Sequence, residues 1–295
     1  MPDPIPTSLV VVIPVGPFCG EQYICDTIES IRHYTAPDHR IIILDDSGKE
    51  TGAAIQKEFA GLDVLKTERN LGKHAGLYLN LSRGLIHASK KYAFQVLLRL
   101  DTDALIIGAN PEQDAIACFK QHPGTGILGS YRTDCNGDSR DFSPPRNKLR
   151  KELGWKHLMQ APLHRFAGWY FLHQLYHRAL RNGYEPGEHC MGGAYFMSRE
   201  CVLRLWQGGL LSRPEIAQSG LEEDHIFGLL IHAVGLRHGD FATGNHPMGL
   251  RWRGLPCTPE ELRLRGKKII HSTRFFDQLS EPEIRNVFQA HRHGQ

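Results

Sequence analysis

Short apolar runs alternate with amphipathic stretches through the first hundred residues. Runs rich in Val, Ile and Leu predict buried strands at residues 9–14, 41–44, 64–65 and 94–100. Apolar residues that recur on one helical face predict helices at residues 22–33 and 51–59, and from the loop at 69–72 to about residue 89. Because strands and helices alternate, we expect an α/β fold with a mostly parallel central sheet flanked by helices on both faces.

The second half of the chain is less regular. We expect helices at 110–122 and 222–234, strands at 126–130, 192–197 and 268–270, and a loop at 133–147. Ser198 is a candidate N-cap for a helix that follows the strand at 192–197. Ser280 and Glu283 flank Pro282 as a capping box, which predicts a helix at the C-terminus.

Aspartates stand at the ends of two predicted strands. Asp45 and Asp46 follow the second strand, and Asp101 and Asp103 follow the fourth. In a sheet of this kind, ligands lie at the carboxyl ends of the strands. Carboxylates gathered at one edge are costly unless something positive joins them, or unless they bind a base or a ribose hydroxyl. A divalent metal and a nucleoside are therefore both candidate ligands for this edge.

Composition and charge narrow the class of protein. The chain has 295 residues, of which 41% are hydrophobic and 23% are charged, as is usual for a globular enzyme. A formal net charge of +3 is too small to favour nucleic acid as the main partner. The seven cysteines include no Cys-x-x-Cys pair, which argues against a disulfide framework and indicates a reducing compartment, the cytoplasm. Asp3 and Pro14 interrupt the pattern of a secretory signal, and no apolar run is long enough to span a membrane, so we expect only peripheral membrane contact.

Several segments match one known family in order and spacing. They are VVVIPVG, TIESI, IIILDDS, RNLGK and LLRLDTD, followed more weakly by GGAYFMSRECVLRLW, LEEDHIFGLLIHAVG and KKIIHSTRF. Taken together, these segments resemble family 2 glycosyltransferases of the GT-A fold, over most of the chain except about residues 133–188. The resemblance implies a donor-binding half at residues 1–104, an acceptor-binding half at 105–275 and a C-terminal helix at 276–295.

The resemblance also implies a metal and a nucleotide-sugar donor. Asp103 would be the direct metal ligand and His271 the second, and hard oxygen ligands with one imidazole suit Mn²⁺ or Mg²⁺. Asp101 would contact the ribose or orient the site. Asp46 would accept a hydrogen bond from a uracil-type base, with Asp45 as the neighbouring alternative. Both aspartates could instead cap the next helix, or serve both purposes. The remaining donor-binding residues would be Pro14, Val15, Asn70, Gly72, Lys73, Thr102 and Gly193.

Glu223 and Asp224 resemble the acidic pair of the family, in which the aspartate is the general base. The helix dipole alone also favours acids at the start of a helix, so a structural role stays open. The implied reaction is an inverting transfer of a hexosyl or N-acetylhexosaminyl group from a UDP-sugar to a hydroxyl of a glycan, glycolipid or protein.

Two alternative functions are considered, and the role of one region of the chain is unassigned. A nucleotidyltransferase would use a related fold, but residues 16–20 lack the Lys or Arg that such enzymes carry after the first strand. A non-catalytic nucleotide- or sugar-binding protein of the same fold is the second alternative. The basic, aromatic region 146–181 could meet anionic lipid or an anionic acceptor, or form a charged helical face beside the acceptor site. His173 and His177 have the spacing of metal ligands on a helix, but their aromatic neighbours favour an amphipathic surface.

Overall fold

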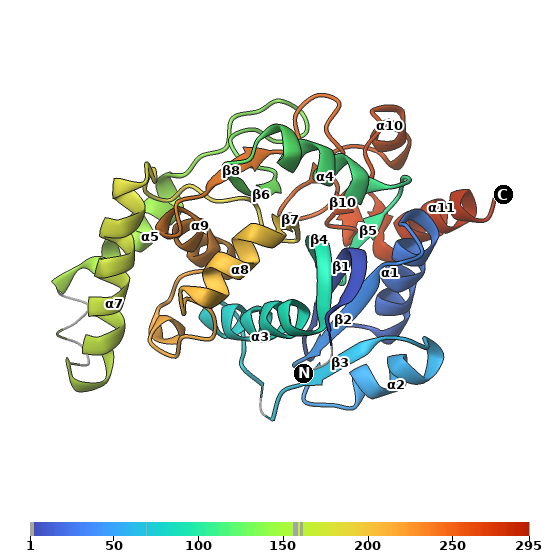
Figure 1. Cartoon of the computed structure of the whole chain (residues 1–295). Helices are drawn as coiled ribbons and strands as arrows, with labels where there is room; N and C mark the ends of the chain where they lie inside the picture. Colours follow the sequence, from blue (N-terminus) through green and yellow to red (C-terminus); the bar gives the residue numbers. More distant parts are fainter. Residues whose placement is uncertain (1–2, 69, 156–158, 160–161, 295) are drawn as a thin grey trace.

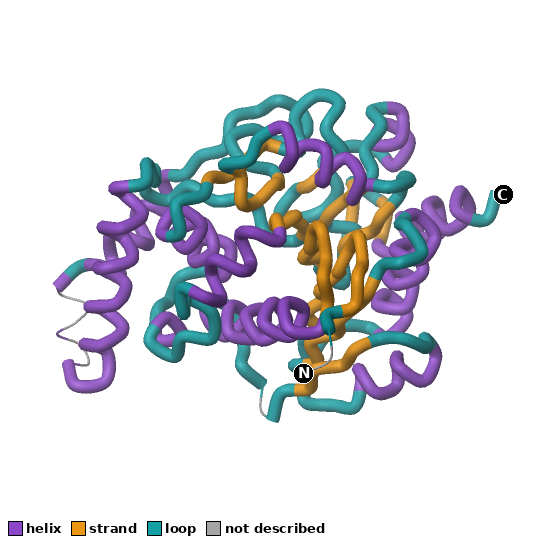
Figure 2. The backbone as a smooth tube through the Cα atoms, viewed as in Figure 1, coloured by secondary structure: helices purple, strands orange, loops and turns teal. Residues whose placement is uncertain are grey.

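A seven-stranded sheet forms the centre of the protein. The structure is a computed structural model, and it describes residues 3–68, 70–155, 159 and 162–294. The strand order is β3-β2-β1-β4-β7-β6-β8, and the strands gather in the middle of the molecule (Figure 2). Their bounds are β3 Asp63–Lys66, β2 Arg40–Asp45, β1 Ile5–Val15, β4 Tyr92–Leu100, β7 Ala194–Ser198, β6 Thr125–Gly129 and β8 Arg237–Asp240. Only β7 runs antiparallel to its neighbours β4 and β6, so the predicted mostly parallel sheet is confirmed.

Helices cover both faces of this sheet (Figure 1). One face packs on α1 Glu21–Tyr34, α2 Thr51–Glu58 and α4 Pro111–Gln121, and the other on α3 Ala75–Lys91, α8 Arg199–Gln207 and α9 Glu223–Ala233. Val10 and Val12 of β1 enter one core, whereas Leu9, Val11 and Ile13 enter the other. A strand buried on both sides has no polar face, which is why residues 9–14 read as a continuous apolar run.

Smaller elements complete the second half. A three-stranded sheet has the order β5-β10-β9, with bounds β5 Ala104–Ile106, β10 Ile269–His271 and β9 Met248–Leu250. The rest are α5 Ser143–Leu153, α7 Pro162–Arg181, the 3-10 helix η1 Ile216–Gln218, α10 Pro259–Leu264, β11 Phe275–Phe276, β12 Leu279–Ser280 and α11 Glu281–Arg292. The caps predicted at Ser198 and at Ser280 with Glu283 are both present. Within the described residues, no helix has the length and apolar character needed to cross a membrane.

The prediction of a loop at 133–147 is wrong in its last part, because α5 begins at Ser143. Pro144 and Pro145 suggested a turn, but proline is well tolerated in the first turn of a helix, where its missing N–H has no helical acceptor. Strands β5, β8 and β9 were also not predicted. They have three or four residues each, too few for a periodic pattern.

Candidate active site

Asp101, Asp103 and His271 meet at the carboxyl end of β4. The two aspartates lie in the turn between β4 and β5, and His271 ends β10. Because β10 pairs antiparallel with β5, His271 lies opposite Ala104, directly beside that turn. His271 Nε2 is 3.4 Å from Asp103 Oδ1 and 3.9 Å from Asp101 Oδ2. A pairing of distant strands thus gathers three groups that could hold a metal ion, all buried or half-buried.

Each of the three side chains uses one polar atom for positioning and presents another to its neighbours. Asp101 Oδ1 lies 2.9 Å from Arg99 Nη2. Asp103 Oδ2 accepts a hydrogen bond of 2.8 Å from Ser272 Oγ, and Arg274 Nε lies 2.8 Å away from it. The His271 Nδ1–H donates to the Arg251 carbonyl over 2.9 Å, which fixes the tautomer with its lone pair on Nε2. Two carboxylate oxygens and one imidazole nitrogen therefore face one another, a donor set that fits a divalent cation of intermediate hardness.

The charges in this cluster balance one another. Burial raises the pKa of Asp101 against the opposing effect of Arg99. Burial also acts to raise the pKa of Asp103, but the interactions with His271, Arg274 and Ser272 outweigh it and hold that pKa below its usual range. Burial lowers the pKa of His271, yet its contact with Asp103 reverses this and raises it. A cation bound between these side chains would supply positive charge to the carboxylates without a proton on His271 Nε2.

Gly193 allows this close approach. Its φ is +94°, in the region that favours glycine, and a Cβ there would lie 2.5 Å from His271 Nδ1. The Gly193 carbonyl accepts a hydrogen bond of 2.8 Å from Asp101 N, so the same residue fixes the start of the aspartate turn. Gly193 therefore lies directly against the metal-ligand candidate His271.

We expect Gly193→Ala to destabilise the protein by about 1–3 kcal/mol, because a residue with a Cβ is strained at this φ. His271 would also have to move, so the variant should lose metal-dependent nucleotide binding. Chemical denaturation and calorimetric nucleotide titration measure the two effects. Gly16→Ala is a matched control, since a Cβ at Gly16 would meet nothing within 4 Å. Equal stability of the two variants would contradict the proposed crowding.

Glu223 and Asp224 open α9, but their surroundings differ. Glu223 is buried, accepts a hydrogen bond from Tyr195 Oη, and has Arg99 Nη2 3.6 Å away. Burial raises the pKa of Glu223 to about 7, despite the opposing effect of Arg99. The Asp224 side chain is 18% exposed and accepts a hydrogen bond of 3.0 Å from Gly192 N. Two neighbouring acids with pKa values shifted apart suit different tasks, and Asp224 is the one that a ligand can reach.

The histidines around Asp224 are neutral groups. Burial lowers the pKa of His189 to about 4, and burial also lowers that of His225. Burial raises the pKa of Asp224, but its contacts with these histidines and the Gly192 N–H lower it below the usual range. Since both histidines are neutral near pH 7, we attribute the low pKa of Asp224 to the Gly192 hydrogen bond and the positive charge of Arg99. An ionised, partly exposed carboxylate can accept a proton.

The aspartates after β2 organise the neighbouring loops. Asp45 Oδ2 accepts a hydrogen bond of 2.8 Å from Gly52 N in the first turn of α2, so Asp45 caps that helix. Asp46 Oδ1 accepts from Thr67 Oγ1 at 2.6 Å and from Leu71 N at 2.9 Å. Asp46 Oδ2 also lies 3.3 Å from Gly72 N. Asp46 therefore holds the loop that carries the predicted donor-binding residues Asn70, Gly72 and Lys73.

Other predicted donor residues border the same edge. Asn70 Nδ2 donates to the Asp46 carbonyl over 2.5 Å. Asn70 and Lys73 line a groove of about 420 Å³ between this loop and the segment around Ser219. Val15 pairs with Asp45 at the end of β1, with Pro14 one residue before it. Thr102 Oγ1 lies 3.2 Å from Cys19 Sγ in the loop after β1.

Side chains at the site that were not predicted from the sequence include Arg99, Tyr195, Ser272, Arg274, His189 and His225. Arg99 gave a usable signal, because a single arginine in the apolar strand 94–100 must find buried charge partners. Ser272 and Arg274 adjoin His271 and could have been considered with it. Nothing local in the sequence marks the Tyr195 hydroxyl as the donor to Glu223.

One family of known sequences matches most of the chain. The sequence model described as glycosyl transferase family 2 matches residues 11–200. No curated protein sequence matches the chain significantly. Residues 1–349 of S. aureus TarS align with 97% of this chain and 72% of that one, with 14% identity and a TM-score of 0.46. The galactosyltransferase LgtC, in complex with donor and acceptor sugar analogs, aligns with 97% of this chain and 95% of that one, with 10% identity and a TM-score of 0.48. Both TM-scores are low, and the family assignment rests on the sequence match.

Proposed function

The chain belongs to glycosyltransferase family 2, and from this premise we propose that it transfers a hexosyl or N-acetylhexosaminyl group from a UDP-sugar to a hydroxyl of a glycan, glycolipid or protein, with inversion at the anomeric carbon. Residues 1–104 would bind the donor and residues 105–275 the acceptor, with 276–295 as a C-terminal helix. Seven free thiols suit a reducing compartment, so we place the protein in the cytoplasm, in peripheral contact with a membrane.

The convergence of Asp101, Asp103 and His271 carries the proposal. Mn²⁺ or Mg²⁺ held by these residues would neutralise the charge that develops on the leaving diphosphate. The residue pattern supports this, because each of the three side chains has one polar atom fixed by a neighbour and another turned to the shared space. Asp101 becomes a candidate third ligand in addition to the roles inferred from the sequence.

Asp224 would act as the general base. As the acceptor oxygen bonds to the anomeric carbon, the bond from that carbon to the diphosphate oxygen breaks. The acceptor hydroxyl proton passes to the Asp224 carboxylate, which Gly192 N–H keeps oriented. Glu223 stays beneath it, held by Tyr195 and Arg99. Its raised pKa and burial suit a supporting role in positioning the helix start.

We expect Asp46→Ala to weaken binding of uridine diphosphate by roughly 1.5–3 kcal/mol, the size of a hydrogen bond to a charged group. Isothermal titration measures the loss. The uracil N3–H can donate to a carboxylate, whereas cytosine N3 carries no hydrogen, so cytidine diphosphate should lose less. An equal loss for both nucleotides would mean that Asp46 acts only by holding the loop at Leu71. If Asp45→Ala lost affinity for uridine diphosphate and Asp46→Ala did not, the base contact would belong to Asp45 instead.

A further inference from the structure

We propose that residues 143–182, the basic arm, dock the protein on the surface of an anionic lipid bilayer. The arm contains α5 and α7, which stand at one edge of the molecule, away from the central sheet (Figure 1). Its sequence has eight Lys or Arg and one acid, Glu152, a formal charge of +7 in a chain whose total is +3. The rest of the chain therefore carries an excess of acid, and the positive charge is concentrated in this one segment.

Apolar side chains are exposed in the same segment. Ten large hydrophobic side chains are exposed across the described part of the chain, and half of them belong to the arm. They are Trp155, Met159, Phe166, Tyr170 and Leu180, with Trp155 65% exposed and Met159 66% exposed. The ring of Phe166 stacks with those of Trp169 and Tyr170, with centroids 6.2 and 6.3 Å apart. This is an apolar surface within a strongly basic segment.

The outer and inner faces of α7 differ in a helical pattern. Phe166, Tyr170, Gln174, His177 and Arg181 recur at intervals of three or four residues, and all are exposed. The opposite face carries Leu172, Leu175 and Ala179, which are buried in the core shared with α9. The outer face is thus aromatic at its start and basic at its end, the composition of a helix that lies in a membrane interface.

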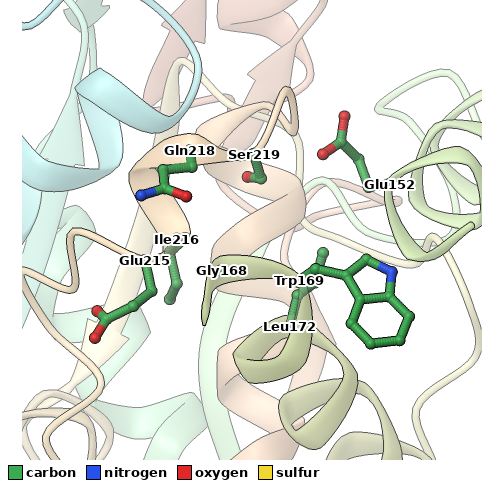
Figure 3. Close-up of a pocket in the computed structure, with 8 residues that line it drawn as sticks. All are labelled: Glu152, Gly168, Trp169, Leu172, Glu215, Ile216, Gln218 and Ser219. Carbon is green, nitrogen blue, oxygen red and sulfur yellow. The ribbon is translucent and has the colours of Figure 1, made fainter. Parts of the chain in front are cut away.

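The inner face fixes the arm firmly to the body of the protein. A Cβ on Gly168 would lie 2.6 Å from the Glu215 carbonyl, so α7 and the segment before η1 are in close backbone contact. A cavity of about 20 Å³, with room for about one water, lies between them (Figure 3). Trp169 Nε1 donates to the Leu153 carbonyl over 3.0 Å, which ties α7 to the end of α5. The exposed aromatic side chains of α7, Phe166 and Tyr170, are therefore presented by a packed helix.

Anionic lipid explains both features together. Lys and Arg bind the negative headgroups, and Trp, Met and Phe enter the boundary between headgroups and acyl chains. A nucleic acid or an acidic protein would account for the charge alone. Residues 153–182 contain no Asp or Glu, so no acid in that stretch would oppose approach to a negative surface.

The arm also contacts the start of the helix that bears the candidate base. Lys148 Nζ of α5 lies 2.8 Å from Glu222 Oε1, and Glu222 is the N-cap of α9, immediately before Glu223 and Asp224. His74 binds the other oxygen of Glu222. Docking through the arm would bring an acceptor carried by a lipid to the side of Asp224. This last step rests on the proposed transfer reaction, whereas membrane docking itself does not.

Vesicle flotation tests the docking without any substrate. The wild-type protein should float with vesicles of phosphatidylcholine and phosphatidylglycerol at low salt, but not with pure phosphatidylcholine. Binding should fall steeply as salt rises, because exposed charges are screened. Arg150→Gln, Lys151→Gln, Arg178→Gln and Arg181→Gln should each weaken binding by about fivefold or less. Lys57→Gln and Lys120→Gln, at exposed cations outside the arm, are the matched controls and should leave binding unchanged.

The apolar contribution has its own variants. The triple variant Trp155→Ser, Phe166→Ser and Tyr170→Ser should reduce binding, whereas Leu264→Ser, at an exposed leucine of α10, should not. In the wild-type protein, brominated lipid should quench tryptophan fluorescence, and Trp155→Phe should remove most of that quenching. The fluorescence measurement does not depend on whether the triple variant folds.

Several outcomes would overturn the docking proposal. They are no flotation with anionic vesicles, equal loss in the control variants, no effect of the apolar substitutions, or binding to duplex DNA in preference to vesicles. Failure of the proposed enzymatic function can be distinguished from failure of the docking proposal. Asp103→Ala should still float with anionic vesicles even though it has lost sugar transfer.

Discussion

Asp224→Asn should lower the turnover number by about 10²–10⁴-fold, the usual effect of removing a general base. The amide has the shape of the carboxylate and can still accept the hydrogen bond from Gly192 N, but it cannot take a proton from the acceptor. Donor affinity and metal dependence should change little, because the donor does not need this group. Steady-state kinetics with nucleotide titration separate the two effects.

Two controls make this result specific. Glu222→Gln alters the exposed acid two positions before Asp224 and should leave turnover within a few fold of the wild type. The product should have inverted configuration, so an α-linked donor should give a β-linked product, as shown by the coupling of its anomeric proton. Retention of configuration would rule out a single displacement. Near-normal turnover in Asp224→Asn would show that Asp224 is not the general base. Glu223→Gln would then be the next variant to measure.

Asp103→Ala should abolish the metal-dependent stabilisation that a nucleoside diphosphate gives the wild-type protein. A ligand present at 100 times its Kd stabilises the folded state by about 2.7 kcal/mol, so the loss is easily seen in a melting curve. Sugar transfer should fall by about 10³-fold or more, because the metal contributes several kcal/mol to stabilising the transition state. Chelation of the metal should have the same effect on the wild-type enzyme and no further effect on the variant.

The same measurement ranks the other ligand candidates. His271→Ala should weaken the metal effect, and Asp138→Ala, at an exposed acid of the loop before α5, should leave it unchanged. Circular dichroism should show that Asp103→Ala stays folded, although Ser272 and Arg274 lose a common acceptor. Unchanged metal-dependent nucleotide binding in Asp103→Ala would end the assignment of the metal to this cluster.

The local pattern was sufficient for the central sheet. The strands at 9–14, 41–44 and 94–100 are apolar because both of their faces are buried, and such runs are readable without knowing their partners. The predicted α/β architecture of the GT-A type is confirmed by the family match and the seven-stranded sheet. The positions of Asp45, Asp46, Asp101 and Asp103 at strand ends follow from the same local signal.

The contacts of the site could not be read in the same way. His271 reaches the aspartates only because β10 pairs with β5, a contact between segments more than 160 residues apart. Local pattern gives no information on such a pairing, and β5 is too short to be recognised. Glu223 differs from Asp224 in its surroundings because it contacts Tyr195 and Arg99, which come from two other strands. The sequence therefore supplied the candidate residues, whereas the contacts that divide their proposed roles come from tertiary neighbours.

Arg99 has a consequence for the order of binding events. It is 3% exposed and lies beside Asp101 and Glu223, and Arg274 lies beside Asp103. These fixed positive charges reduce the field that a free divalent ion experiences at the carboxylates, so the ion alone should bind weakly. A nucleoside diphosphate brings negative charge of its own and should raise the affinity for the ion, and the ion should raise the affinity for the nucleotide by the same factor. We therefore expect ion and nucleotide to arrive as one complex, and the spent diphosphate to leave together with its ion after each transfer.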